Sequence, residues 1–154
     1  MNRIFIIAHA PLAHALREIA LHVFPDSAAA IAALDVQSGA QPEDTLLQAE
    51  NMMGELNKTG QKDNKKGVIL LCDILGATPC NVATQLAEKY AAKLVVGVNV
   101  PMLLRVLTYK HETLDQLVVR ALAGGTQGVL AVAMTAPQHQ SLKRHDQNHH
   151  DHQQ

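Results

Sequence analysis

The segment GVILLCDILGATPCNVA, residues 67–83, decides the fold of this chain. It opens with a continuous aliphatic run at 67–71, which is typical of a parallel strand covered on both faces. After a turn of small residues, Thr78 as N-cap and Pro79 at the first helical position predict a helix that continues to about Tyr90. A buried strand that runs through a short turn into a helix is the building unit of parallel α/β sheets.

The chain before this segment shows the same alternation. Residues 3–8 (RIFIIA) form another aliphatic run, which predicts a second buried strand. Apolar residues then recur at three- and four-residue steps from Leu12 to Val23, which indicates an amphipathic helix that ends before Pro25. We further expect a weaker strand at 32–36, a helix at about 43–56 and a polar surface loop at 59–66.

The chain after this segment alternates in the same way. We expect a strand at 94–100, helices at 101–107 and 113–122, and a last strand at 128–134. Strands separated by helices predict an α/β fold in three layers, with an open, mainly parallel sheet, helices on both of its faces and right-handed crossovers.

Composition bounds the domain organisation and excludes several classes of protein. The 154 residues, 47% apolar and 18% charged, fit one folded domain at 1–134. Residues 135–154 hold five of the nine histidines, and we expect a disordered His- and Gln-rich tail there. A net charge of −1 without a basic stripe, and 3% aromatic residues, argue against nucleic acid as a partner. The N-terminal apolar run is too short for a signal peptide or a membrane span, so we expect a cytoplasmic protein without direct membrane insertion.

Two residues with reactive side chains follow predicted strands. His9 comes directly after the strand at 3–8, and Asp73 comes just after the strand at 67–71. Ligands of open parallel sheets bind beyond the carboxyl ends of the strands, so the carboxylate could orient the imidazole if these strands are neighbours. A lone histidine at this place is more often a capping or partly buried residue, and its carboxylate partner is what favours chemistry.

The turn after Asp73 indicates an anion site. Gly76, Ala77 and Thr78 lead into a helix whose first backbone N–H groups and dipole favour a phosphate group. The turn is neither a Walker A loop nor a GxGxxG fingerprint, so nothing in it supports nucleotide binding. We therefore expect no cofactor and no metal at this site.

Three blocks of the chain resemble the IIA component of mannose/fructose/sorbose-type phosphoenolpyruvate-dependent sugar phosphotransferase systems. They are the strand-end histidine in IFIIAHAPLA, the block GVILLCDILGATPCNVA and the block VVGVNVPMLLRVL. In that family they read approximately as a strand ending in THG, as D-x-x-G-[GA]-[ST]-P-x-N-x-A and as GVN-[IV]-PM. The resemblance covers about residues 1–134. It is incomplete at Ala10 and Pro11, where the family usually has Gly, and at Ile74, where a hydroxyl residue is common.

The resemblance implies a phosphocarrier that accepts a phosphoryl group on His9 from phospho-HPr and passes it to a IIB protein or domain for sugar uptake. It also implies that Asp73 orients His9. The chemistry agrees, because an imidazole accepts a phosphoryl group only when it is neutral, and a carboxylate on its other N–H selects that tautomer. The backbone at Gly76, Ala77 and Thr78 would stabilise the phosphoryl oxygens. Which sugar is carried, if any, stays open.

Other interpretations also stay open. A regulatory or dihydroxyacetone-kinase-linked phosphoprotein fits the same blocks. A metal-binding module could act through the tail histidines, for which a solubilising tail is the simpler interpretation; they are His139, His145, His149, His150 and His152. His14, Glu18 and His22 lie four residues apart and could hold a metal, although a solvated helix face also accounts for them.

Two further pairs of residues are interpreted structurally or left open. Cys72 and Cys80 have no metal-ligand spacing and are expected to be small core residues. Asn99 and Pro101 follow a predicted strand, where they shape either a pocket rim or an ordinary turn.

The strand expected at 128–134 bears on assembly. Gly124 and Gly125 precede it and can turn the chain away from the domain. An isolated apolar edge strand favours aggregation, and pairing with a partner removes that hazard. The resemblance implies a homodimer in which this edge strand is exchanged between subunits, so we expect a homodimer in which each subunit keeps its own His9 pocket.

Overall fold

The structure is a computed structural model, and it describes residues 1–58 and 67–133. Its elements alternate along the chain as the sequence predicts, apart from the last strand. In order they are β1 (Arg3–His9), α1 (Leu12–Val23), the 3₁₀ helix η1 (Pro25–Ala30), β2 (Ile31–Val36), α2 (Pro42–Lys58), β3 (Val68–Cys72), α3 (Thr78–Tyr90), β4 (Lys93–Val96), α4 (Val100–Thr108) and α5 (Leu114–Gln127).

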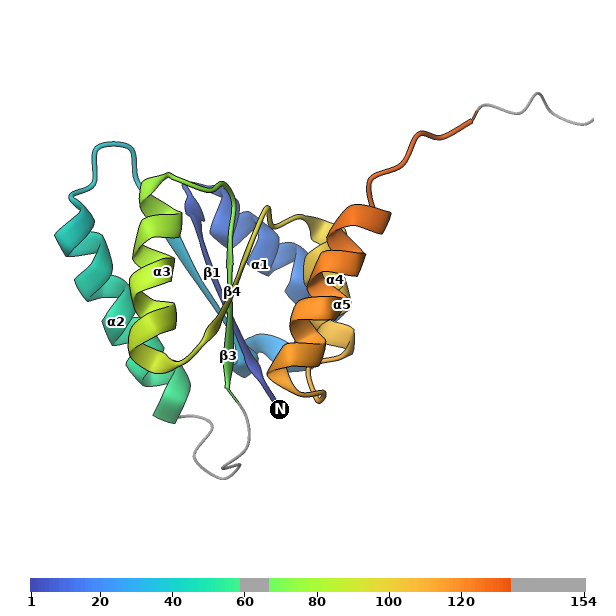
Figure 1. Cartoon of the computed structure of the whole chain (residues 1–154), viewed down its shortest axis with the longest axis horizontal. Coiled ribbons are helices and arrows are strands. Elements are labelled where there is room, and N and C mark those ends of the chain that lie inside the picture. The colour runs from blue at the N-terminus through green and yellow to red at the C-terminus, as the bar shows by residue number, and fades with distance from the viewer. Residues whose placement is uncertain (59–66, 134–154) are drawn as a thin grey trace, which may run out of the picture.

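The strands of the described residues form one parallel sheet in the order β2-β1-β3-β4 (Figure 1). The register pairs Ile4 of β1 with Ile31 of β2 on one side and with Ile69 of β3 on the other. Because the strands are parallel, their carboxyl ends lie at one edge of the sheet. This is the edge at which open α/β folds bind ligands.

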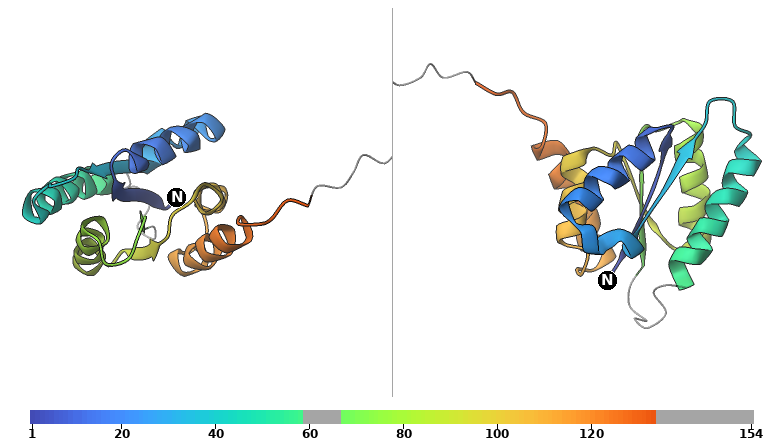
Figure 2. Two further views of the ribbon diagram at one scale, coloured as in Figure 1. Left: turned by 90° about the horizontal axis from the view of Figure 1, so that it is seen from above. Right: turned by 180° about the vertical axis from the view of Figure 1, so that it is seen from behind.

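Helices cover both faces of the sheet, as the three-layer prediction requires. One core packs α1, α4 and α5 against one face, with Leu16, Leu103 and Leu117 among its buried side chains. The second core packs α2 and α3 against the opposite face, with Met53 and Leu86 among its buried side chains. Figure 2 shows from above that α2 and α3 lie on one side of the strands and α1, α4 and α5 on the other. Alternate residues of β1 point into the two cores, which is why this strand reads as a continuous apolar run.

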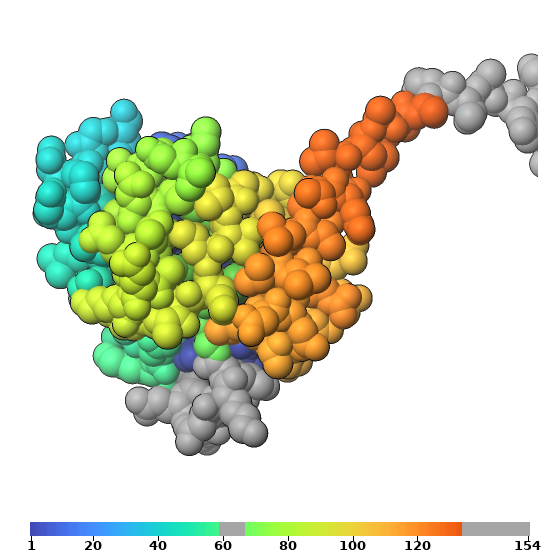
Figure 3. Space-filling model, viewed as in Figure 1, coloured from blue at the N-terminus to red at the C-terminus, as the bar shows by residue number. Residues whose placement is uncertain are grey.

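The strand predicted at 128–134 is not formed in the part of that range that the structure describes, so this prediction is wrong for the single chain. Residues 128–133 form a turn and an arm that projects from the end of α5, away from the sheet (Figure 1), and that stands clear of the rest of the molecule (Figure 3). Val129 is 75% exposed and Val132 is 78% exposed. A strand is stable only where a neighbour pairs with its backbone, and the arm has no such neighbour at this place.

Gly124 and Gly125 do not turn the chain away from the domain, as the sequence suggested. They lie inside α5, which continues to Gln127, and they let α5 pack closely on α4. A Cβ at Gly124 would lie 2.7 Å from the Cβ of Arg105 and 3.0 Å from the carbonyl oxygen of Pro101. The glycine pair is therefore required by packing between the two helices.

The strand predicted at 94–100 is also shorter than expected. β4 ends at Val96, since Gly97 takes a left-handed φ of 88° and Asn99 accepts a hydrogen bond from the N–H of Met102 as the N-cap of α4. The predicted tail at 135–154 lies outside the described residues. In the described part of the chain, no helix is both long and apolar enough to cross a membrane.

Candidate functional site

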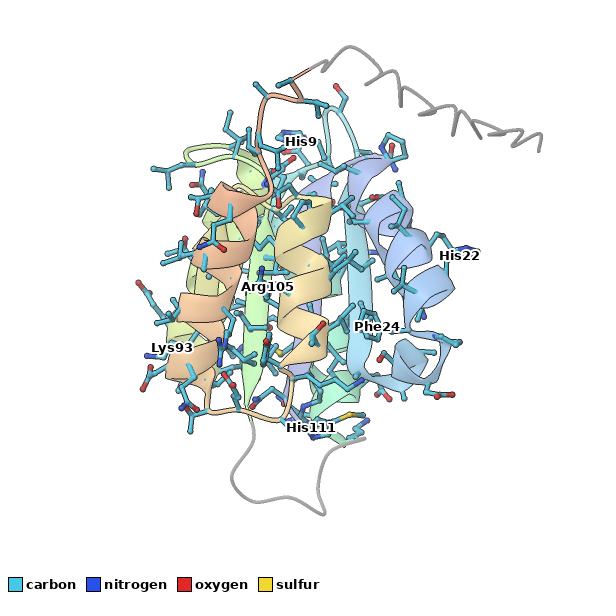
Figure 4. The ribbon with its side chains drawn as sticks, turned by 90° about the vertical axis from the view of Figure 1, so that its right-hand side faces the viewer. His9, His22, Phe24, Lys93, Arg105 and His111 are labelled. Atoms are coloured by element: carbon cyan, nitrogen blue, oxygen red, sulfur yellow. The ribbon has the colours of Figure 1, made fainter. Side chains whose placement is uncertain are left out.

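β1 and β3 are neighbours, as a contact between His9 and Asp73 requires. The register places Ile7 beside Cys72, so His9 and Asp73 follow at adjacent strand ends. Figure 4 shows His9 at the carboxyl edge of the sheet, at the end of the molecule opposite to His111. The two residues that the sequence analysis selected therefore meet at the ligand-binding edge of the fold.

Asp73 holds both the ring and the backbone of His9. Its Oδ2 accepts a hydrogen bond from the ring Nδ1 of His9 at 2.7 Å and one from the backbone N–H of His9 at 2.9 Å. Its Oδ1 accepts the backbone N–H of Ile74 at 2.9 Å. The Asp73 side chain is 14% exposed, whereas the His9 side chain is 51% exposed. The imidazole is thus fixed on one side and open to a reactant on the other.

These contacts set the ionisation of Asp73 and the tautomer of the His9 ring. Burial by itself would raise the pKa of Asp73, but the hydrogen bonds from the backbone and ring of His9 and from the N–H of Ile74 outweigh it and hold the pKa below the usual 3.8. The carboxylate is therefore ionised at neutral pH. Because an ionised carboxylate only accepts hydrogen bonds, the neutral ring of His9 carries its proton on Nδ1 and a lone pair on Nε2.

A cavity of about 340 Å³ lies beside His9. It is lined by the end of β1, the loop after β2 and the start of α3, with the residues His9, Ala10, Val36, Gln37, Ser38, Gly39, Ala40 and Thr78. Thr78 thus lines the same cavity as His9. The first turn of α3 offers backbone N–H groups without partners in the helix and the positive end of the helix dipole, which suits an anion at this place.

The turn before α3 differs from the prediction in detail. The N-cap is Ala77, so Thr78 is the first residue of the helix and Pro79 the second. The turn itself depends on Gly76, whose φ of 83° lies in the left-handed region. Gly76 and Ala77 are not among the residues that line the cavity, so the structure brings only Thr78 of the three predicted phosphate-binding residues to it.

Sequence reasoning missed the loop after β2. Gln37, Ser38 and Gly39 line the cavity together with His9. The rule that selected His9 and Asp73, which favours residues just beyond strand ends, also selects this loop once β2 is known to lie next to β1. The missing information was the order of the strands in the sheet.

His14 does not join Glu18 and His22 in a metal site. Its ring Nδ1 donates instead to Oδ2 of Asp35 at 2.8 Å. Across residues 1–58 and 67–133, no group of three or more side chains of the metal-binding kind comes together.

The remaining candidates, the cysteine pair and Asn99, make contacts inside the fold. Cys72 and Cys80 are buried free thiols, as expected of core residues. Burial, and then the contact with Cys80, raises the pKa of Cys72, so this thiol stays protonated at neutral pH. Asn99, besides capping α4, donates its side-chain amide to the carbonyl oxygen of Gly125 at 3.1 Å and so ties α4 to α5.

The chain is similar in sequence to a curated protein and similar in fold to solved structures. It is 33% identical over 88 residues, 54% of its length, to the PTS system mannose-specific EIIAB component of Escherichia coli strain K12, and the match spans 27% of that protein. The solved mannose/sorbose specific IIA subunit of Enterococcus faecalis superposes with a TM-score of 0.74 at 19% identity, covering 88% of this chain and 97% of that one. The phosphotransferase system component EIIA of Streptococcus agalactiae gives 0.69 at 23% identity, covering 85% and 97%.

The solved structures are too distant in sequence to show more than the fold. A family model shows the family of the chain, because it matches residues 3–122. This range includes β1, β3 and the whole of α3. The chain belongs to the family of PTS system fructose IIA components.

Proposed function

We propose that this protein is a phosphocarrier of a sugar phosphotransferase system, in which His9 accepts a phosphoryl group from phospho-HPr and passes it to a IIB protein or domain. The observation that carries the proposal is the 2.7 Å contact between Nδ1 of His9 and Oδ2 of Asp73, beside the cavity at the sheet edge. Membership of the IIA family supports it. The cytoplasmic location expected from the sequence belongs to the same proposal.

The transfer is an exchange of one N–P bond for another. The lone pair on Nε2 of His9 attacks phosphorus, the N–P bond of the donor phosphohistidine breaks, and the donor imidazole leaves with the electron pair of that bond. Positive charge develops on the His9 ring, and Asp73 stabilises it through the proton on Nδ1. Passing the group to the IIB partner repeats the exchange with a nucleophile of that partner.

The start of α3 is proposed to hold the phosphoryl oxygens. Phosphoryl transfer depends mainly on positioning and on stabilising charge on these oxygens. Thr78 lines the cavity, and Gly76 and Ala77 form the turn that precedes Thr78 at the start of α3. The proposed reaction uses no metal ion and no nucleotide.

We propose further that residues 1–134 act as one domain and that the arm pairs with a second copy in a homodimer. The arm exposes the apolar side chains of Val129, Leu130 and Val132. β4 forms an edge of the sheet and so has backbone groups available for another strand. Light scattering of the intact protein at micromolar concentration should give the mass of a dimer, and a clean monomer contradicts this proposal.

The phosphocarrier proposal is tested with phosphoenolpyruvate, enzyme I and HPr. The protein should acquire an acid-labile, base-stable phosphate. His9→Gln should lose the rapid phase of this labelling, whereas His111→Gln, at the opposite end of the molecule, should retain it (Figure 4). Labelling of His9→Gln at the wild-type rate contradicts the assignment.

A further inference from the structure

Two imidazole–carboxylate pairs of nearly the same geometry occur in the structure, and the proposed function uses one of them. In the second pair, Nδ1 of His14 donates to Oδ2 of Asp35 at 2.8 Å, compared with 2.7 Å between His9 and Asp73. The His14 and Asp35 side chains are 59% and 15% exposed, compared with 51% and 14% in the first pair. Each pair thus combines a largely buried carboxylate with an exposed imidazole ring.

Asp35 is fixed by the fold much as Asp73 is. It lies near the carboxyl end of β2, next to Ala8 of β1 in the register. Its Oδ1 accepts the backbone N–H of Ala13 at 2.9 Å and that of His14 at 3.2 Å, which satisfies donors in the first turn of α1. Oδ2 is then directed to the ring. A carboxylate oxygen that accepts from the ring at this place puts the ring proton on Nδ1 and leaves the lone pair on Nε2.

The position of His14 on α1 also favours a phosphorylated ring. A phosphoryl group brings about −1.5 to −2 charges at neutral pH, and the positive end of a helix dipole stabilises negative charge within the first turn. His22 provides the opposite case on the same helix. It lies in the last turn, at the negative end of the dipole, and its side chain has no hydrogen-bond partner among the described residues. Figure 4 shows its side chain pointing away from the body of the protein.

We propose that His14 is a second phosphoryl acceptor, activated by Asp35, for donors that carry a phosphorus–nitrogen bond. With phosphoramidate in its N-protonated form, the Nε2–P bond forms, the P–N bond of the donor breaks, and neutral ammonia leaves with the electron pair of that bond. The proton on Nδ1 stays between the ring and Asp35, and the negative charge of the carboxylate balances the positive charge that develops on the ring. The same chemistry applies to a protein phosphohistidine as donor, and only that case rests on the proposed function.

The test is chemical phosphorylation of the full chain with phosphoramidate, followed by mass spectrometry that assigns phosphate to individual histidines. His14 should be labelled at least about tenfold faster than His22, because the Asp35 carboxylate stabilises the positive charge that develops on the His14 ring. Asp35→Asn should slow labelling of His14 by about tenfold or more, while its side-chain oxygen still accepts the N–H groups of α1. Circular dichroism verifies that this variant is folded. Equal rates at His14 and His22, or an Asp35→Asn variant that labels His14 at the wild-type rate, overturn the proposal.

A second arm separates this proposal from the proposed function. His9→Gln should still acquire phosphate on His14 from phosphoramidate, and His14→Gln should still acquire it on His9. Phospho-HPr is then used as the donor in a parallel reaction. If it labels His14, the donor class of this residue includes a protein phosphohistidine. If only phosphoramidate labels His14, the donor class is limited to small compounds with a P–N bond. If phospho-HPr labels no histidine of the wild type, the phosphocarrier proposal fails while the phosphoramidate result for His14 stands. If phosphoramidate leaves His14 unlabelled while His9 is labelled, only the His14 proposal fails.

Discussion

Replacing Asp73 by asparagine should slow phosphorylation of His9 strongly, because an amide cannot reproduce what the carboxylate does. The two oxygens of Asp73 accept three N–H groups, two from His9 and one from Ile74. An asparagine has one oxygen and one NH₂ group. If its NH₂ group faces Ile74, two donors oppose each other and the ring loses a charged partner. If the NH₂ group faces His9, the ring must accept on Nδ1, and Nε2 then carries the proton instead of the reacting lone pair.

The size of the effect follows from these two cases. Exchanging a charged hydrogen bond for a neutral one costs about 1–2 kcal/mol, since the two kinds are worth about 1.5–3 and 0.5–1.5 kcal/mol. This corresponds to about a 5- to 30-fold slower transfer. Holding the wrong tautomer costs about 10⁴-fold in the serine-protease triad, which has the same carboxylate–imidazole arrangement. The expected loss for Asp73→Asn therefore lies between about fivefold and about 10⁴-fold.

The assay is single-turnover phosphorylation by phospho-HPr in a quenched-flow instrument. Asp115→Asn is the matched control, since Asp115 is an 83% exposed carboxylate in the first turn of α5, paired with Lys93 at 2.8 Å. Lys93 lies far from His9 in Figure 4. The control should transfer at the wild-type rate. An Asp73→Asn variant that does the same, while folded, refutes the role assigned to the carboxylate.

Three further predictions concern stability. Gly124→Ala should lower the free energy of unfolding, measured in urea titrations, by about 1–3 kcal/mol, because the new methyl group would lie 2.7 Å from the Cβ of Arg105. An unchanged free energy of unfolding contradicts the close packing of α4 and α5. Gly54 lies in the interior of α2, and nothing lies within 4 Å of a methyl group added there. Gly54→Ala should therefore raise the free energy of unfolding by about 0.5–1 kcal/mol. A loss of stability would show that this helix is packed differently. The pKa of Asp73 is lower in the folded protein than in the unfolded chain. The ionised carboxylate therefore stabilises the folded protein at pH values above the pKa of the unfolded chain, and this stabilisation is lost as the pH falls through the pKa of the folded protein. The difference in unfolding free energy between wild type and Asp73→Asn should therefore be constant near neutral pH and shrink below pH 3.8, and a difference independent of pH contradicts the shift.

The strands and the contact between His9 and Asp73 could be predicted from the sequence because local signals decide them. β1 and β3 are continuous apolar runs, and His9 and Asp73 stand directly at their ends. The three-layer architecture follows from the alternation of such runs with amphipathic helices. The predicted partnership of the two residues needed one further condition, that β1 and β3 are neighbours, and the sheet meets it.

The remaining features depend on contacts that no local pattern contains. The loop at Gln37 and Ser38 lines the cavity because β2 lies beside β1, and the strand order is a property of the whole sheet. Gly124 and Gly125 resemble a hinge in the sequence, but the neighbouring helix α4 makes them a close contact inside α5. The predicted strand at 128–134 was inferred from an apolar run, and such a run forms a strand only where another strand pairs with it.

The most direct test of the account is to locate the phosphate after one turnover with phospho-HPr. The wild-type protein should carry it on Nε2 of His9, as shown by fragmentation that preserves the P–N bond and by the phosphorus NMR signal. Phosphate on Nδ1 would contradict the tautomer that the contact of 2.7 Å with Asp73 imposes. A protein that takes up phosphate rapidly at another residue, with His9 unmodified, would contradict the site itself.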